Sequence, residues 1–438
     1  MTDGVRVGVG REDITPPLGT LLMGYPDPKR KAESVRDPLN VTALVFEAGD
    51  SAGALLSLDL GIVDDPEVKA IRDGVEARTG IPGDTVAVCA IQTHSSPCTQ
   101  PVWGWCDKDE GYIEFAVDRS VQAALKAKEG LRPARLGIGT AQSDVGVNRR
   151  RITEDHKVVL GVNPWGAYDP EMTVLSFQDD TGPLATVIHY GAHPTVLSSA
   201  SRVVSRDWPG VMVDRVETLT GAPALFINGA VGDIAPRSNF LRAVGDGETA
   251  LMEVGSRAAM DAMRAYRSIK DVRRLDFSAM TGDFLLPYRP LPALDEARPQ
   301  LARAEAHKDE YGQGMCEFKY WRAVIQAHEG SPLKGKHFRQ IILRLGPAVV
   351  VPFPGEPFAE TVLRLRHYSP YQHTLCASTS CGNNGYFPTR ESLHRGGYEI
   401  WIARGLGAYI LVEAIDDVLV EENLKLLREL HAQGACAH

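Results

Sequence analysis

Short apolar runs alternate with helical patterns along the whole chain. Runs rich in β-branched and apolar residues that close on Gly, Pro or Asp predict strands, and several are apolar at consecutive positions, as in strands buried on both faces. The predicted strands are Val41–Glu47, Gly53–Leu60, Thr85–Ile91, Leu136–Thr140, Met172–Phe177, Ala185–Tyr190 and Ala224–Asn228, followed by a pair at Phe338–Leu345 and Ala348–Val351.

Amphipathic patterns between and after these runs predict helices. The predicted helices are Pro66–Thr79, Gly111–Glu129, Pro209–Thr220, Glu248–Ser268, Ala297–Glu329 and Ala408–Leu430. Strands and helices mix throughout, without an evident internal repeat or linker, which favours one large α/β domain over residues 1–438. The weakest candidate boundary is the proline-rich segment near Leu286–Arg298, and we do not divide the chain there.

Composition narrows the class of protein. The 438 residues are 44% hydrophobic and carry a net charge of −9, which argues against nucleic-acid binding and against a polybasic membrane surface. The sequence shows no apolar run long enough for a transmembrane helix and no signal peptide at its start. Seven scattered cysteines favour reduced thiols and therefore a cytoplasmic location.

Polar residues follow two of the predicted strands, at positions where catalytic groups are common. Gln92 and His94 follow the run that ends at Ile91, and an extended chain would place both on one face. His193 follows a second strand and shares a face with His189. Taken alone, each histidine fits a structural role better than metal ligation.

A carboxylate and two tyrosines complete the inventory. Glu356 leaves a Pro/Gly turn, where it either caps the next helix or serves as a functional acid, and without context capping is favoured. Tyr386 and Tyr398 lie in glycine-rich loops, where aromatic residues often only pack. Together, strand-end histidines, a turn carboxylate and loop tyrosines suit a mononuclear catalytic metal site with a position open to water.

Ten short pieces, in order along most of the chain, carry a resemblance. They include Arg11-Glu-Asp-Ile-Thr-Pro16, Thr93-His-Ser-Ser-Pro97, Val147-Asn-Arg149, Ala192-His-Pro-Thr195, Ser205-Arg-Asp-Trp-Pro-Gly210, Gly232-Asp-Ile-Ala-Pro236, Pro354-Gly-Glu356 and the loops of Tyr386 and Tyr398. With these motifs the chain resembles the catalytic domain of the neutral/alkaline ceramidase family, whose members are zinc-dependent amidases.

The resemblance implies two stacked mixed β-sheets flanked by helices and a zinc ion held by two histidines, a glutamate and a tyrosine. By position, His193, Glu356 and Tyr386 match three of these ligands. Arg149 and Tyr398 match residues that contact the substrate's amide region, and His94 matches a histidine beside the metal.

Three departures from the family pattern affect this expectation. The first histidine ligand is replaced by Gln92, so either His94 takes over, or Gln92 coordinates through its amide oxygen, or the metal differs or is absent. An amide oxygen is a harder ligand than imidazole and disfavours zinc. Ala235 replaces a family serine, and the sequence shows neither a signal peptide nor the extra C-terminal domain of the secreted ceramidases, so we expect ceramide not to be the substrate.

The expected function is hydrolysis of a small soluble amide or related acyl compound by metal-activated water, with zinc on His193, Glu356, Tyr386 and His94. Arg149 and Tyr398 would stabilise the oxyanion, and His94 lies with them in the expected catalytic set. The proton donor is expected among Asp59, Asp207 and Asp233, and Trp103, Trp105 and Trp165 either contact substrate or pack. Two alternatives stay open: a glycosidase or lactonase on the same scaffold, with or without metal, and a non-catalytic metabolite-binding relative. The oligomeric state is not predicted.

Overall fold

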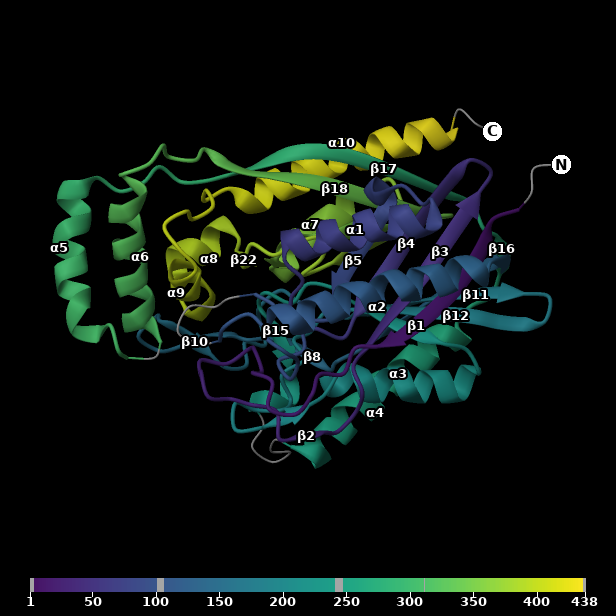
Figure 1. The fold of residues 1–438 in the computed structure, drawn as a ribbon, viewed down its shortest axis with the longest axis horizontal. Coiled ribbons are helices and arrows are strands. Elements are labelled where there is room, and N and C mark those ends of the chain that lie inside the picture. Colours follow the sequence, from purple (N-terminus) through teal and green to yellow (C-terminus); the bar gives the residue numbers. More distant parts are fainter. Residues whose placement is uncertain (1–3, 101–105, 241–246, 311, 436–438) are drawn as a thin grey trace.

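Three mixed β-sheets, each covered by helices, form the fold in the computed structural model, which describes residues 4–100, 106–240, 247–310 and 312–435 (Figure 1). This confirms the predicted α/β class, with three larger sheets where the resemblance implied two. The N-terminal sheet holds β1 (Arg6–Asp13), β3 (Asn40–Ala48), β4 (Ser51–Leu58), β5 (Val86–Ala90) and β6 (Arg132–Pro133). The central sheet holds β7 (Arg135–Gln142), β11 (Glu171–Asp179), β12 (Gly182–Tyr190), β14 (Ala224–Asn228) and β16 (Val272–Arg274). The C-terminal sheet holds β17 (Phe277–Pro287), β18 (Gly335–Leu345), β19 (Ala348–Pro352) and β21 (His373–Ala377).

The three sheets share one order of connection. In each, three antiparallel strands are followed by a helix, a fourth strand parallel to the third, and a second helix that packs back on the sheet. The helix pairs are α1 (Asp65–Thr79) with α2 (Glu110–Glu129), α3 (Asp207–Thr220) with α4 (Glu248–Arg267), and α7 (Ala359–Tyr368) with α10 (Ile415–Ala435). The chain therefore repeats one topology three times, although the sequence shows no repeat.

Glycines in the first strands let the second helices approach closely. A Cβ at Gly10 of β1 would lie 2.1 Å from the carbonyl oxygen of Ala123 in α2, and one at Gly139 of β7 would lie 2.0 Å from that of Ala265 in α4. Both positions have no room for a side chain, so the helix backbone rests directly on the strand.

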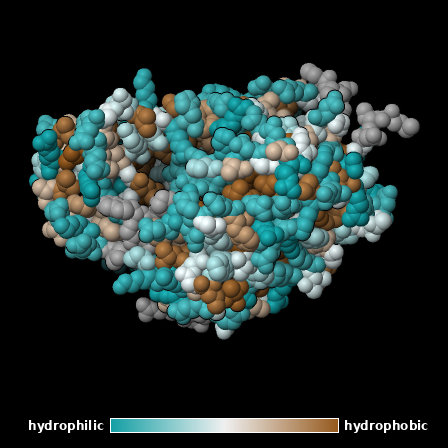
Figure 2. All heavy atoms as spheres, in the orientation of Figure 1, coloured by the Kyte–Doolittle hydropathy of each residue, from teal (hydrophilic) through white to brown (hydrophobic). Residues whose placement is uncertain are grey.

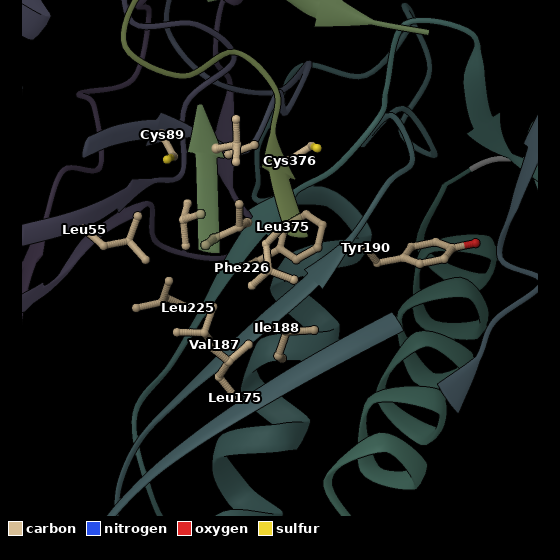
Figure 3. Packing of buried hydrophobic residues seen from close by; sticks show 14 of the residues in the cluster. Leu55, Cys89, Leu175, Val187, Ile188, Tyr190, Leu225, Phe226, Leu375 and Cys376 are labelled. Carbon is tan, nitrogen blue, oxygen red and sulfur yellow. The ribbon is translucent and has the colours of Figure 1, made fainter. Parts of the chain in front are cut away.

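One apolar cluster connects the three sheets and runs from Val5 to Leu430. Figure 3 shows part of it, where side chains of the N-terminal sheet (Leu55, Cys89), the central sheet (Val187, Phe226) and the C-terminal sheet (Leu375) gather in one layer. Burial of this continuous apolar surface holds the sheets together.

The sheets also meet through hydrogen bonds at the ends of their fourth strands. The Asn228 side chain, at the end of β14, donates to Ile91 O (2.8 Å), and Ser378 N donates to Asn228 O (2.8 Å). Ala90 N, at the end of β5, donates to Thr379 O (3.2 Å). The segments that leave β5, β14 and β21 therefore start from a common junction.

Smaller elements surround this junction. They are the two-stranded sheets β2 (Ser34–Val35) with β13 (Val203–Val204), β8 (Gly146–Asn148) with β15 (Ile234–Pro236), β9 (Arg150–Ile152) with β10 (Val158–Leu160), and β20 (Glu356–Pro357) with β22 (Tyr386–Phe387), and the helices α8 (Arg390–Arg395) and α9 (Tyr398–Gly405).

Two predicted helices differ from the structure. The helix predicted at Ala297–Glu329 is a hairpin of α5 (Leu294–Ala304) and α6 (Gln313–Ala327), seen at the left of Figure 1, and Gly312 has φ 129° just before α6, a glycine conformation that a helix does not contain. The last helix begins at Ile415 and not at Ala408, because the segment before it pairs with the end of β17. There Arg289 N donates to Ile410 O (2.7 Å) and Val412 N donates to Pro287 O (2.9 Å).

The cysteine prediction needs a correction. Cys98 and Cys106 form a disulfide, whereas Cys89, Cys316, Cys376 and Cys381 are free and buried. The expectation that all thiols are reduced is therefore wrong for this pair. Its two cysteines are eight residues apart in the chain, and a scattered set of seven cysteines gave no sign of this pairing.

Polar residues predominate on the face of the molecule in Figure 2, and apolar side chains lie there in small groups. Within the residues that the structure describes, none of the helices is both long and apolar enough to span a bilayer.

Candidate active site

The candidate site lies at the junction of the three sheets. Gln92 follows β5 of the N-terminal sheet, His193 follows β12 of the central sheet, and Glu356 follows β19 of the C-terminal sheet. All three side chains are at most 5% exposed, and Glu356 contacts both of the others. Residues that are 264 positions apart in the chain are thus brought together by the repeated topology.

Gln92 is oriented by Glu356. The Gln92 amide nitrogen donates to Glu356 Oε1 at 2.7 Å. Because a carboxylate can only accept, the amide oxygen Oε1 must point elsewhere, and it is buried without a hydrogen-bond partner among the described residues. Strand β5 ends at Ala90 and Gln92 has φ 69°, so the extended alternation predicted for Gln92 and His94 does not hold.

His193 presents one ring nitrogen to the site. Its Nδ1 lies 3.1 Å from the carbonyl oxygen of Ile234, which can only accept, and 3.3 Å from Arg149 Nη1, which can only donate. The shorter contact, with Ile234, favours the tautomer that carries the proton on Nδ1. The other nitrogen, Nε2, then faces Glu356 Oε2 at 3.2 Å as a lone pair. Both atoms are buried and unpartnered within the described part of the chain, so two acceptors face each other in a space suited to a cation.

Glu356 does not cap a helix. It lies in β20, whose parallel partner β22 places Tyr386 opposite it. Helix α7 begins at Ala359, and its N-cap, Phe358, makes no side-chain cap. Of the two readings of the sequence, the carboxylate turned toward the site is the one observed.

His94 lies beside these residues. Its ring centroid is 5.6 Å from that of His193 and 5.1 Å from that of Tyr25. Burial, with His193 and nearby arginines, lowers the pKa of His94 well below its usual value, so the ring is neutral near pH 7. Among the described residues, no three His, Cys, Asp or Glu side chains are placed to share one metal ion.

Arg149 connects the site to its tyrosines. Its Nη2 donates to Gly232 O (2.8 Å) and to the Tyr386 hydroxyl (3.2 Å), and its Nη1 is 3.3 Å from His193 Nδ1. The guanidinium carbon lies 5.7 Å from the ring centroids of both Tyr386 and Tyr398. The structure thus brings Arg149 together with His193, Tyr386 and Tyr398, all of which the sequence analysis named.

The phenols of Tyr386 and Tyr398 are both protonated at neutral pH. Burial raises the pKa of Tyr398 to about 12. Burial and the neighbouring Glu356 carboxylate raise the pKa of Tyr386 well above its usual value, against the opposing effect of Arg149. Both hydroxyls can therefore donate hydrogen bonds to a developing oxyanion.

Glu399 is a site residue that the sequence did not reveal. It is 1% exposed, and its two oxygens accept from Arg149 Nε (2.9 Å) and Arg150 Nη1 (2.5 Å). A possible signal was the pair of adjacent arginines, because two buried cations require a buried anion.

The three candidate proton donors are engaged elsewhere. Asp207 accepts from the backbone of Val196 and Leu197, Asp59 accepts from Asn40 N, and Asp233 accepts from Ala359 N and the Asn148 amide. Burial raises the pKa of Asp59 and of Asp207 to about 6 and that of Asp233 to about 7.

The remaining sequence candidates lie away from the site or outside the described residues. His189 contacts the carbonyl oxygen of Cys376 through Nε2 at 2.9 Å and is structural. Trp165 is 93% exposed and lines a cavity of about 610 Å³ together with Arg150. Trp103 and Trp105 fall outside the residues that the structure describes.

Buried polar side chains from three sheets of an α/β fold meet here, as in a ligand-binding site. Comparison with known proteins identifies the family of the chain. The chain belongs to the neutral/alkaline non-lysosomal ceramidase family, whose N-terminal model matches residues 5–241. A neutral ceramidase of Pseudomonas aeruginosa is 27% identical over 256 residues, which are 53% of this chain and 37% of that protein. The match therefore spans little more than a third of that relative's length.

Solved structures extend the likeness in fold to almost the whole chain. A crystal structure of neutral ceramidase from Pseudomonas aeruginosa has a TM-score of 0.73 at 18% identity, over 97% of this chain and 75% of that one. A structure described as ceramidase complexed with C2 has a TM-score of 0.76 at 17% identity, over 98% and 76%. The fold likeness thus extends beyond residues 5–241, which the family model matches.

Proposed function

We propose that this protein is a hydrolase that cleaves a small soluble amide, or a related acyl compound, at a divalent metal ion. The observation that carries the proposal concerns three residues joined through the Glu356 carboxylate. Each leaves one buried atom unpartnered among the described residues: Gln92 Oε1, His193 Nε2 and Glu356 Oε2. Buried acceptors without donors are costly, and a bound cation removes that cost.

The donor set fits a metal ion. His193 Nε2 and Glu356 would hold it, together with Tyr386, which pairs with Glu356 across β20 and β22. Gln92 or His94 would complete the set. The contact of His193 Nδ1 with a backbone carbonyl is the second interaction that usually orients a metal-binding imidazole. When bound, such an ion supplies Lewis-acid polarisation of an acyl carbonyl and activates water near neutral pH.

The chain's own residues supply binding and charge stabilisation. Arg149 presents a guanidinium held by Glu399, so its remaining donors are fixed before substrate arrives. Tyr398, whose pKa is about 12, keeps its proton and donates it in a hydrogen bond to the carbonyl oxygen. One such donor contributes roughly 3–4 kcal/mol to transition-state stabilisation.

The proposed substrate is compact because the donor atoms are buried. His193 is fully buried and Gln92 is 3% exposed, so the scissile bond must reach below the surface. A cytoplasmic location stays a prediction, and the Cys98–Cys106 disulfide removes one argument for it, since such bonds are rare in that compartment. A small-molecule substrate and the absence of nucleic-acid and membrane partners also stay predictions.

The test is hydrolysis by the purified full chain, stripped of metal and then reloaded with Zn²⁺ or Mn²⁺. The panel contains N-acyl amino acids, short N-acyl amines, N-acetylsphingosine, lactones and aryl glycosides. We expect metal-dependent release of amine from the small amides, abolished by Glu356→Gln and retained by Glu360→Gln, an exposed residue on α7. Turnover of lactones or glycosides alone would select those alternatives, and saturable binding without turnover would indicate a metabolite-binding protein.

A further inference from the structure

We propose that the metal site of this protein is adapted to a hard divalent cation of the Mn²⁺ type, with the amide oxygen of Gln92 as a ligand. The proposal rests on the proposed function only in placing a metal at the junction of the three sheets. It adds the identity of the fourth donor and the resulting preference among metals.

The orientation of Gln92 carries the inference. Glu356 Oε1 accepts from the Gln92 amide nitrogen at 2.7 Å, so the amide cannot exchange its nitrogen and oxygen without losing that bond. The other oxygen of the same carboxylate lies 3.2 Å from His193 Nε2, so Glu356 holds the amide and the imidazole at one place. Gln92 is 3% exposed, and Oε1 has no partner in the described part of the chain. A buried amide held by one end and unsatisfied at the other is preorganised to accept a ligand or an ion.

The resulting donors are predominantly oxygens. Gln92 offers an amide oxygen, Glu356 a carboxylate oxygen and Tyr386 a phenol oxygen, against one imidazole nitrogen from His193. Oxygen donors suit Mg²⁺, Ca²⁺ and Mn²⁺, whereas imidazole favours Zn²⁺ and the later transition metals. An imidazole nitrogen at position 92, in place of the amide oxygen, would move the metal preference of the site toward zinc.

His94 does not supply the missing nitrogen. Its Nδ1 is also buried without a hydrogen-bond partner among the described residues, but this nitrogen lies against Gly24. A Cβ at Gly24 would lie 2.7 Å from Nδ1, and the ring packs edge-on against Tyr25, so the ring is enclosed on that side. No His, Cys, Asp or Glu cluster that includes it is suited to one ion among the described residues. The second imidazole thus stands beside the donor set.

The backbone at position 92 permits a direct exchange of donor. Gln92 has φ 69°, and histidine is among the residues enriched in this left-handed region. Gln92→His is therefore expected to fold. Gln92→Met keeps the length of the side chain and removes the amide donor and the amide acceptor. Gln326→His is the matched control, because it adds an imidazole at an exposed position on α6.

The experiment measures affinity and not activity. Metal-free full-length wild type and the three variants are titrated with Zn²⁺ and with Mn²⁺ against a chelating dye, and bound Mn²⁺ is recorded by electron paramagnetic resonance. We expect Gln92→His to raise the Zn²⁺-over-Mn²⁺ affinity ratio by about tenfold or more, and Gln92→Met to weaken Mn²⁺ binding, with Gln326→His unchanged.

Each outcome decides the matter. An unchanged affinity ratio in Gln92→His, or Mn²⁺ binding unaffected by Gln92→Met, overturns the role of Gln92 and leaves the proposed hydrolase standing. Failure of wild type and Gln92→His alike to bind either ion at the site overturns the metal site itself, and with it the metal-dependent function.

Discussion

Glu399 accepts a hydrogen bond from Arg149 Nε at 2.9 Å, in an ion pair whose side chains are 7% and 1% exposed. Because the other Glu399 oxygen is taken by Arg150, the carboxylate is clamped from two sides and cannot follow a moving guanidinium. Glu399 is therefore a positioning residue, and Arg149 is the group that it aims at Tyr386 and His193.

Replacing Glu399 with Gln should lower both activity and stability. The change leaves two buried guanidinium groups without their anion, and breaking a buried pair in this way typically costs about 3–5 kcal/mol in the free energy of unfolding. Urea unfolding would measure that loss, and steady-state kinetics would show a lower kcat with KM little changed. A variant with full kcat and reduced stability would show that Glu399 has only a structural role.

The pH dependence of stability should change in the same variant. Burial alone would raise the pKa of Glu399, but Arg149 and Arg150 lower it below its usual 4.5. A carboxyl whose folded pKa is depressed stabilises the protein above its unfolded pKa and loses that contribution as the pH falls through the folded value. The stability difference between wild type and Glu399→Gln should thus shrink below about pH 4, and a constant difference down to pH 2 would contradict this assignment.

Arg149→Lys and Arg150→Lys form a matched pair of tests. Lysine keeps the charge but cannot reach Glu399, Gly232 and the Tyr386 hydroxyl together, so Arg149→Lys should lower kcat by about 10²–10³-fold. Arg150 instead donates to the carbonyl oxygens of Gly396 and Ser392. Its replacement should reduce the melting temperature with a much smaller effect on kcat, and equal kcat losses in both variants would remove the special role of Arg149.

The Cys98–Cys106 disulfide should contribute measurably to stability. The bond closes a short loop, and the loop-entropy relation gives roughly 2–3 kcal/mol for a loop of this size. Thermal unfolding with and without a reductant would show this as a lower melting temperature on reduction. The double variant Cys98→Ser/Cys106→Ser serves as the control, because reductant should leave it unaffected; an equal response in both proteins would assign the effect to other thiols.

Gly139→Ala should destabilise the central sheet. The added methyl group would lie 2.0 Å from the carbonyl oxygen of Ala265, so strand β7 and helix α4 must separate, at a cost of about 1–3 kcal/mol or more. Gly130→Ala is the control, since the nearest atom there is 3.4 Å away. Comparable midpoints of urea unfolding for the two variants would show that the close approach is not required.

Much of the fold was predictable because buried strands have a strong local pattern. The strands of the first half, and helices such as α1 and α2, lie close to their predicted ranges. Strand β1 was not predicted, because Gly8 and Gly10 are typical of turns in a sequence. Only the structure shows that these glycines let α2 pack closely on the strand. The common topology of the sheets was also hidden, since it depends on the order of pairing and not on residue identity.

The candidate site was predictable in its members and not in its contacts. The motifs pointed to Arg149, His193, Glu356 and Tyr386, which the structure brings together. The sequence could not show that Gln92 binds Glu356, because that contact depends on a left-handed backbone at position 92 and on two sheets far apart in the chain. Nor could it reveal Glu399, whose role exists only in relation to two arginines 250 and 249 positions away.

The equivalent placement of Gln92, His193 and Glu356 on three sheets has a thermodynamic consequence. A ligand that binds among them bridges all three sheets, so its binding free energy adds to the stability of their docking and not to that of any one sheet. Occupancy would couple the unfolding of the three units into a single cooperative transition. A partly unfolded molecule that has released one sheet would lose its ligand at the same moment.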